Sequence, residues 1–242
     1  MFHDFINLLY PASCHICQAE LVKNEHILCT SCLHDLPVTR YHLDNDNPVK
    51  KIFQGRIKID KATALLHFRK KSGVQQLIHD LKYRGHQEIG KYLGTWLGEE
   101  LSAIDDYRKI DLVLPVPLHK SRLKERGYNQ VEAFGIEIAN KLDAQYRSDL
   151  LLKVNAMQTQ TKKGRISRWG KIEQTLQIHK PDELKGKNVL LVDDLVTTGA
   201  TLEACAHKLL EIENIPNPLT PFNFPCLILL LGSLLGSTKN LH

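Results

Sequence analysis

The sequence lacks the features of a secreted or membrane-spanning protein. Its first residues, Met1-Phe-His-Asp-Phe5, contain no basic segment before an apolar core, so no signal peptide is predicted. An apolar run near the end, Cys226–Leu235, is too short and too interrupted by glycine for a confident membrane span. We therefore expect a cytoplasmic protein.

Charge of one sign is not in large excess either. The formal net charge is +5, which fits phosphate-bearing ligands or nucleic acid without requiring either. With 242 residues, of which 43% are hydrophobic and 24% charged, the chain suits one globular domain and a small appendage.

Four of the six cysteines form two CxxC pairs, Cys14/Cys17 and Cys29/Cys32, with eleven residues between the pairs. Such pairs indicate metal binding in a reducing compartment rather than disulfides. Four thiolates suit a closed, structural zinc site, and a module this small needs the metal to fold. His15 could compete as a ligand, and a redox dithiol is the rival interpretation for either pair alone. We assign residues 1–45 to this zinc ribbon-like module and a linker, because residues 33–47 are polar and contain Pro37.

Apolar runs after this module alternate between strand and helix patterns. Strands are predicted at 61–68, 110–118, 150–154 and 189–192, and helices at 74–81, 89–101, 127–139 and 202–210. This order predicts an α/β domain with a parallel sheet flanked by helices, over residues 55–213.

The stretch Asn188–Thr201 combines an apolar strand, two adjacent carboxylates and a hydroxyl-rich turn with a glycine. Asp193 and Asp194 would lie at the carboxyl end of the strand, where open α/β sheets bind ligands. The turn opens a helix, whose free N–H groups can hold a phosphate. A ligand with both a phosphate and vicinal hydroxyls fits this pattern, although an ordinary strand end and helix cap is the alternative.

This stretch resembles the loop of type I phosphoribosyltransferases that binds phosphoribosyl pyrophosphate (PRPP). The resemblance implies that Asp193 and Asp194 contact the ribose. It also implies that the following turn wraps the 5′-phosphate, through Thr197, Thr198, Gly199, Ala200 and Thr201.

Three basic segments could contact phosphates. They are Lys82–His86, His119–Gln130 with five Lys, Arg or His among twelve residues, and Lys162–Lys171 with five Lys or Arg and no acid. The alternative for the first segment is a solvated helix end without a ligand, and the alternative for the third is a basic loop without one. Tyr128 and Trp169 could stack on bases or could simply be packed. A P-loop near Gly170 is rejected, because the spacing is one residue too long and Ile172 replaces the required Ser or Thr.

The double CxxC, the Leu77–Gly85 segment, the Val113–Gln130 segment and the PRPP-type loop together resemble the ComF family over residues 10–210. That family places a zinc module before a type I phosphoribosyltransferase domain and is associated with competence. The resemblance implies a pyrophosphate-binding loop at Val116, Pro117, Leu118 and His119. Eight basic residues are candidates for nucleic-acid or phosphate contacts: Lys82, Arg84, Lys120, Arg122, Arg126, Lys162, Arg165 and Arg168.

The resemblance implies binding of PRPP or ribose 5-phosphate, with magnesium accompanying PRPP, and a role in natural transformation. Single-stranded DNA and DNA-uptake proteins are then expected partners. The alternative is an active phosphoribosyltransferase with an unknown acceptor, and a third possibility is a PRPP sensor without catalysis. No residue stands out as an obligatory general base, so the sequence leaves enzymatic activity undecided.

Residues 214–242 form an atypical apolar tail. From Asn214 onward there is no Asp or Glu, and prolines occur at 216, 218, 221 and 225. We expect this tail not to supply the last strand that the family usually has, and a shifted reading frame or a truncated end is the leading hypothesis. The sheet beside the acidic pair would then be incomplete.

Overall fold

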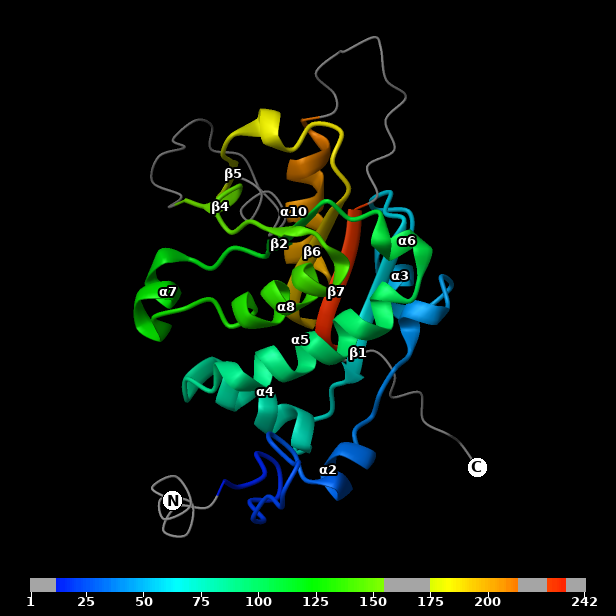
Figure 1. Ribbon diagram of the computed structural model, residues 1–242. Coiled ribbons are helices and arrows are strands. Elements are labelled where there is room, and N and C mark those ends of the chain that lie inside the picture. Colours follow the sequence, from blue (N-terminus) through cyan, green and yellow to red (C-terminus); the bar gives the residue numbers. More distant parts are fainter. Residues whose placement is uncertain (1–11, 155–174, 213–225, 234–242) are drawn as a thin grey trace.

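A five-stranded parallel sheet forms the centre of the molecule (Figure 1). This computed structural model describes residues 12–154 and 175–212, and the backbone of residues 226–233. The strand order is β1 (Lys61–His67), β7 (Cys226–Ser233), β6 (Val189–Val196), β2 (Leu112–Pro115) and β3 (Gln145–Tyr146). All neighbouring pairs are parallel. The predicted α/β class is confirmed.

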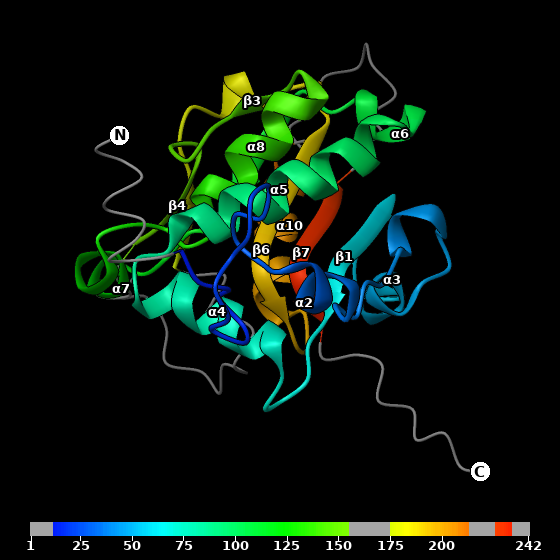
Figure 2. The same ribbon diagram turned by 60° about the horizontal axis from the view of Figure 1, so that its bottom comes forward.

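Helices cover both faces of this sheet (Figure 2). α4 (Gly73–Tyr83), α5 (Gln87–Ser102) and α8 (Glu132–Leu142) pack on one face, against Leu190 and Val192 of β6. α10 (Ala200–Leu210) packs on the other face, against Val189 and Leu191. Consecutive residues of a strand point to opposite faces, so the fully apolar Val189–Val192 run reflects burial on both sides.

Close helix packing on the first face depends on a glycine. A Cβ atom at Gly94 of α5 would lie 2.5 Å from the carbonyl oxygen of Phe134 in α8. The two helices therefore approach more closely than any larger residue at this position would permit.

The remaining elements are short. They are α2 (Thr30–His34), η1 (Tyr41–Leu43), α3 (Pro48–Phe53), α6 (Asp105–Arg108), α7 (Lys120–Arg126) and η3 (Pro181–Glu183), with β4 (Leu151–Lys153) and β5 (Leu176–Ile178) as a separate antiparallel pair. Among the described residues, no helix has the length and apolarity that crossing a membrane requires.

The segment predicted to be a linker, residues 33–47, is instead packed onto β1. Thr39 N donates to the Leu65 carbonyl at 3.0 Å, and His67 N donates to the Pro37 carbonyl at 2.8 Å. Asn47 is 2% exposed and its amide donates to the carbonyl oxygens of Tyr41, Asp44 and Ala62. The linker prediction was wrong, because polar side chains here satisfy buried backbone carbonyls rather than solvate a free chain.

The expectation that the tail supplies no further strand was also wrong. β7, within residues 214–242, lies between β1 and β6 and pairs in parallel with both (Figure 1). Its register places Leu229 beside both Thr63 of β1 and Val192 of β6. β1 therefore joins the sheet only through β7, and the sheet beside the acidic pair is complete.

Candidate functional site

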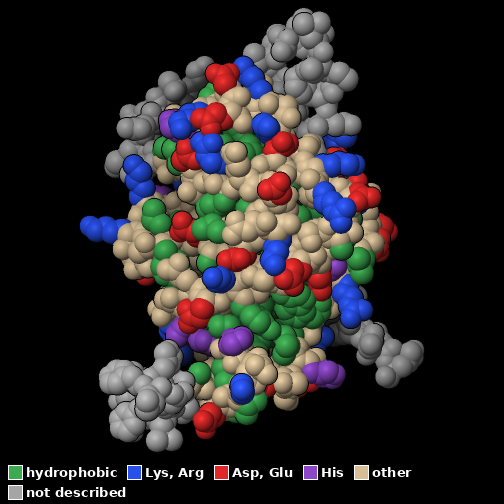
Figure 3. Space-filling view, viewed as in Figure 1, with side chains coloured by type: hydrophobic (Ala, Val, Ile, Leu, Met, Phe, Trp, Pro, Cys, Tyr) green, Lys and Arg blue, Asp and Glu red, His purple; other side chains and the backbone are tan. Residues whose placement is uncertain are grey.

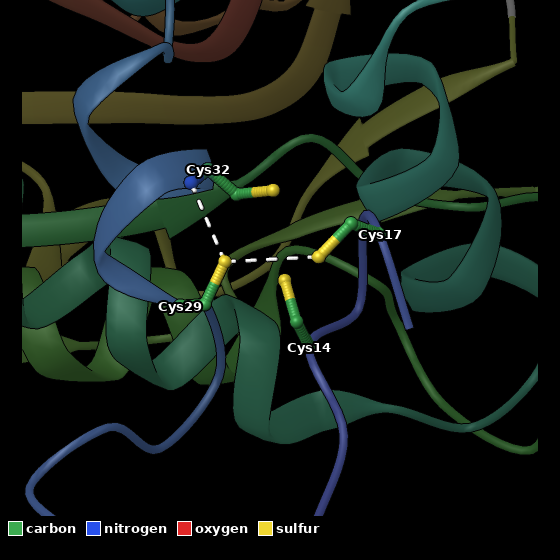
Figure 4. A group of neighbouring side chains, drawn as sticks. All are labelled: Cys14, Cys17, Cys29 and Cys32. Atoms are coloured by element: carbon green, nitrogen blue, oxygen red, sulfur yellow. Dashed lines mark hydrogen bonds between the residues drawn. The ribbon is translucent and has the colours of Figure 1, made fainter. Parts of the chain in front are cut away.

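The four paired cysteines converge on one point, as Figure 4 shows. Cys14 and Cys17 come from the first turn of the N-terminal module, while Cys29 and Cys32 begin α2. All four sulfur atoms lie within 4.8 Å of one another, and the sulfurs of Cys17 and Cys29 are 3.7 Å apart. A tetrahedral zinc ion with bonds of ~2.3 Å requires sulfur–sulfur distances of about 3.8 Å. The cluster therefore fits one structural zinc ion.

The electrostatics of the cluster also favour a cation. Burial raises the pKa of the Cys14 thiol, but backbone hydrogen bonds at Cys17, Cys29 and Ile16 outweigh it and bring the pKa to about 6. Burial, and then the neighbouring cysteines, raise the pKa of the Cys32 thiol. Several thiolates cannot form side by side without a compensating positive charge, and a bound divalent metal supplies it.

The acidic pair lies in the second half of β6, beyond the end of β2. The last paired residues of these two strands are Pro115 and Val192, so Asp193 and Asp194 project past the edge of β2. The strand itself continues to Val196, four residues further than predicted, because β7 pairs with it up to that point. The carboxylates lie near the carboxyl ends of the parallel strands, as expected.

Asp194 is held by side chains from α4 and from the turn before α8. Lys82 of α4 places its ammonium nitrogen 2.5 Å from Asp194 Oδ2, and the Gln130 amide donates to the same oxygen at 2.9 Å. Arg126 at the end of α7 donates to Gln130 Oε1 at 2.6 Å. Asp194 is only 6% exposed, so this network supplies the positive charge and hydrogen bonds that a buried carboxylate needs.

Asp193 has a different environment, because the strand alternation directs it toward the opposite face. Its Oδ1 accepts a hydrogen bond from the Asp194 backbone N–H at 2.8 Å. Burial, and then the adjacent Asp194 carboxylate, raise the pKa of Asp193, against smaller opposing effects of Lys82 and Lys153. The two neighbouring carboxyl groups therefore do not both ionise readily, and a ligand that brings hydroxyl donors or a cation would favour their charged forms.

The turn after β6 presents two exposed threonines and a buried glycine. Gly199 has a φ of +72°, and a Cβ atom there would lie 2.9 Å from both Ile52 and Phe53 of α3. The Arg56 guanidinium donates to the Thr198 carbonyl at 3.0 Å and pairs with Glu203 of α10. The segment around α3 thus supports the turn from outside, while the first backbone N–H groups of α10 face the turn.

The predicted pyrophosphate loop connects β2 to α7. Val116 is buried and is fixed on both sides, since its N–H donates to the Val192 carbonyl and its carbonyl accepts from the Asn129 amide. His119 caps α7, with Nδ1 accepting from the Ser121 N–H at 3.3 Å. Pro117 and Leu118 line a cavity of about 380 Å³, which Lys120, Asn129, Tyr146 and Lys153 also line.

Comparisons with known proteins identify two matching families and several relatives. A family described as phosphoribosyl transferase domain matches residues 132–215, and one described as double zinc ribbon domain matches residues 5–42. The DNA utilization protein YhgH of Escherichia coli (strain K12) is 27% identical over 203 residues, which cover 82% of this chain and 84% of that protein. The competence protein ComFC of Bacillus subtilis is 32% identical over 138 residues, 57% of this chain and 54% of that protein.

The resemblance to the ComF family is confirmed. The chain is a ComF-like protein that joins a double zinc ribbon to a phosphoribosyl transferase domain. A hypoxanthine phosphoribosyltransferase structure from Staphylococcus aureus is 20% identical and covers 61% of this chain and 64% of that chain, with a TM-score of 0.35. The fold assignment rests on the sheet topology and the two family matches instead.

The basic residues proposed for this ComF-like protein differ in their surroundings. Lys82 contacts the acidic pair, whereas Arg84 pairs with Asp80 at 3.3 Å. Lys120 and Arg122 are exposed on α7, and no ion pair is recorded for either within the described residues. Lys162, Arg165 and Arg168 lie outside the described residues, as does Trp169.

Several residues near the ComF-like site were not singled out from the sequence. Gln130 contacts Asp194 from the turn before α8, and Lys153 of β4 acts on Asp193 only through its charge. Arg56 lies 142 residues before the threonine whose carbonyl it contacts. Glutamine and lysine are common everywhere, so no local pattern could have identified them. Tyr128 is packed, since its hydroxyl donates to the Leu81 carbonyl.

Proposed function

We propose that this protein binds PRPP or ribose 5-phosphate at the carboxyl edge of β6 and acts in the handling of single-stranded DNA during natural transformation. The observation that carries the proposal is the adjacency of the acidic pair, Lys82 and the start of α10. In this arrangement Asp193 and Asp194 would accept hydrogen bonds from ribose hydroxyls. Thr197–Thr201 would surround the 5′-phosphate, and the segment 116–119 would meet the pyrophosphate.

Magnesium would enter with PRPP, and it would neutralise part of the pyrophosphate charge. Oxygen donors are the ligands that magnesium prefers, and the two carboxylates at this edge are of that type. Lys82 already neutralises Asp194, so we expect it to move toward the ligand phosphates once a ribose hydroxyl occupies the carboxylate.

Calorimetric titration with Mg-PRPP tests the binding proposal. We expect saturable binding by the wild-type chain and at least about tenfold weaker binding by Asp193→Asn/Asp194→Asn, because hydrogen bonds to charged groups contribute about 1.5–3 kcal/mol each. Asp182→Asn, an exposed carboxylate on η3, is the matched control and should bind like wild type. Equal heats for the wild-type and double-variant proteins would exclude the acidic pair from the site.

The DNA part of the proposal is supported by an exposed aromatic beside the site. Tyr83 is 61% exposed, and the Arg126 guanidinium lies 5.1 Å from the centre of its ring. Stacking on an aromatic face and contact with a nearby cation are how proteins hold unpaired bases. The exposed cations of α7 extend this surface. The printed names of the relatives, DNA utilization protein and competence protein, point the same way.

Fluorescence anisotropy with single-stranded oligonucleotides across salt tests this part. We expect Tyr83→Ala and Arg122→Glu/Arg126→Glu each to weaken binding, with the charge reversal also lowering the dependence on salt. Arg108→Glu, an exposed change on α6, is the control. Binding that is absent at low salt, or unaffected by both variants, would remove DNA from the proposal.

The alternative is an active phosphoribosyltransferase. A nucleophile would displace pyrophosphate from the anomeric carbon, with one bond to the sugar formed as the bond to pyrophosphate breaks. The cavity of about 380 Å³ beside Pro117 and Lys153 favours this alternative, since an acceptor could occupy it. Pyrophosphate release from PRPP across a panel of bases and amines tests it. We expect weak turnover or none, and substantial turnover with one acceptor would make the enzyme the primary function.

A further inference from the structure

A second group of metal-binding side chains lies outside the cysteine cluster. His15, His86 and Glu88 each place one ligand atom within 4.8 Å of the others. His15 belongs to the first CxxC turn, His86 precedes α5, and Glu88 is in the first turn of α5. Histidine side chains gather in the lower part of the face in Figure 3, where α4 lies above the N-terminal module. The group therefore connects two parts of the chain that are far apart in sequence.

The distances within this group are close to those of a metal site. Glu88 Oε1 is 2.6 Å from His86 Nδ1 and 3.8 Å from His15 Nε2. Bonds of about 2.0–2.2 Å in a tetrahedron need donor atoms about 3.4 Å apart. One distance must lengthen and the other must shorten. Both of these distances involve the Glu88 side chain, which is 49% exposed and has room to shift.

His15 is also oriented as metal-binding histidines usually are. Its second ring nitrogen, Nδ1, lies 3.9 Å from Asp80 Oδ2, while Nε2 faces Glu88. Asp80 is 1% exposed and is held by the Gln76 amide at 3.0 Å and by Arg84 at 3.3 Å. A carboxylate on this side of the imidazole would fix the ring and strengthen it as a ligand once the pair closes to hydrogen-bond distance.

We propose that His15, His86 and Glu88 bind a second divalent transition-metal ion, of the kind that zinc represents. Two imidazoles and a carboxylate suit zinc, cobalt or nickel, and a third protein ligand leaves one position for water. Four thiolates already complete the cysteine site, so His15 is not needed there and serves the second ion instead. The ion fastens the first CxxC turn to the turn after α4, the helix whose Lys82 contacts Asp194.

Cobalt titration of the untagged full-length chain, with zinc retained in the cysteine cluster, tests this proposal. We expect one further saturable cobalt equivalent per chain, measured by elemental analysis and by visible absorption. Its spectrum should contain ligand-field bands without sulfur-to-metal charge transfer, because no thiolate is involved. His86→Gln/Glu88→Gln should lose this equivalent, and Asp80→Asn should bind it about 10- to 100-fold more weakly.

His34→Gln is the matched control, because its side chain is 88% exposed in the same module and outside the group. It should keep the second equivalent. Glu88→Gln alone should also lose the second equivalent. Because Glu88 is exposed, this change should leave the fold intact. Absence of a saturable extra equivalent in the wild-type chain would overturn the proposal. So would an equal uptake by the double variant, or a thiolate charge-transfer band for the added cobalt.

Discussion

The cysteine cluster and the acidic-pair site are built in opposite ways. The four cysteines fall within residues 14–32 and meet through two short turns. The acidic pair comes from β6, but the side chains that contact it come from α4 and from the turn before α8. Its strand is paired by β7 from near the end of the chain. A metal can assemble the first site locally, whereas the second exists only when the whole sheet has formed.

The two regions are therefore stabilised by different interactions. In the small module, a zinc ion held by the four cysteines would add to the free energy gained where Ile27, Leu28 and Leu36 pack into the core of the main domain. The second region depends on apolar burial on both faces of the sheet and on a strand order in which β7 joins β1 to β6. A substitution in the first region should therefore change mainly the zinc content, whereas one in the second should change mainly the free energy of unfolding.

Breaking β7 should have the largest effect. Leu229→Pro removes a ladder hydrogen bond in a strand that is paired on both sides, and we expect a loss of more than about 3 kcal/mol of unfolding free energy. Thermal unfolding followed by circular dichroism measures it, with zinc content determined in parallel. Ser237→Pro, which lies outside β7, is the control. Unchanged unfolding of Leu229→Pro would show that the sheet does not need this strand.

Removing one cysteine should affect mainly the N-terminal module. Cys29→Ser leaves three thiolates, so we expect loss of the tightly bound zinc while binding of Mg-PRPP changes little. Zinc is measured after dialysis, and PRPP binding by calorimetry. Cys205→Ala, a buried cysteine in α10, should keep the zinc. A parallel loss of PRPP binding in Cys29→Ser would show that the two regions are coupled.

Gly199→Ala should destabilise the turn after β6 by about 1–2 kcal/mol. The residue has a φ of +72°, which L-residues adopt at a cost, and its Cβ atom would press on Ile52 and Phe53. Chemical denaturation measures the free energy, and we expect weaker PRPP binding as well. Gly186→Ala is the control, because Gly186 has a similar φ of +67° but no atom near the position of a Cβ. Its loss of stability measures the backbone strain alone, and the excess in Gly199→Ala measures the steric contact. Equal losses in both variants would contradict a role for the contact with α3.

Asp193→Asn should stabilise the folded chain by about 1 kcal/mol at neutral pH. Because the pKa of Asp193 is raised on folding, the wild-type carboxyl favours the unfolded state once the pH exceeds the unfolded pKa of about 3.9. The gain should therefore vanish below about pH 4, where the carboxyl is protonated in both states. Denaturation at both pH values measures it, with Asp182→Asn as control. A gain of the same size at acidic pH would contradict the charge explanation.

Local patterns were sufficient for much of this molecule. The CxxC spacing predicted the cysteine cluster, and the alternation of apolar runs predicted β1, α4, α5 and α10 at nearly their observed positions and the first half of β6. They failed for residues 33–47 and for the tail, whose compositions favour a linker and an irregular end. In both cases long-range pairing decided the structure: Thr39 and His67 join the first segment to β1, and β7 fills the gap between β1 and β6.

The sequence by itself determined which chemical groups the protein has: four thiolates at metal-binding spacing, and two carboxylates followed by a threonine–glycine turn. These patterns are readable because their members are near neighbours in the chain, so backbone geometry alone brings them together. Only the tertiary structure decided that Lys82 and Gln130 hold Asp194, that Arg56 supports the turn at Thr198, and that His15 faces His86 and Glu88. Contacts over such separations arise from the packing of helices on a completed sheet, which no short segment specifies.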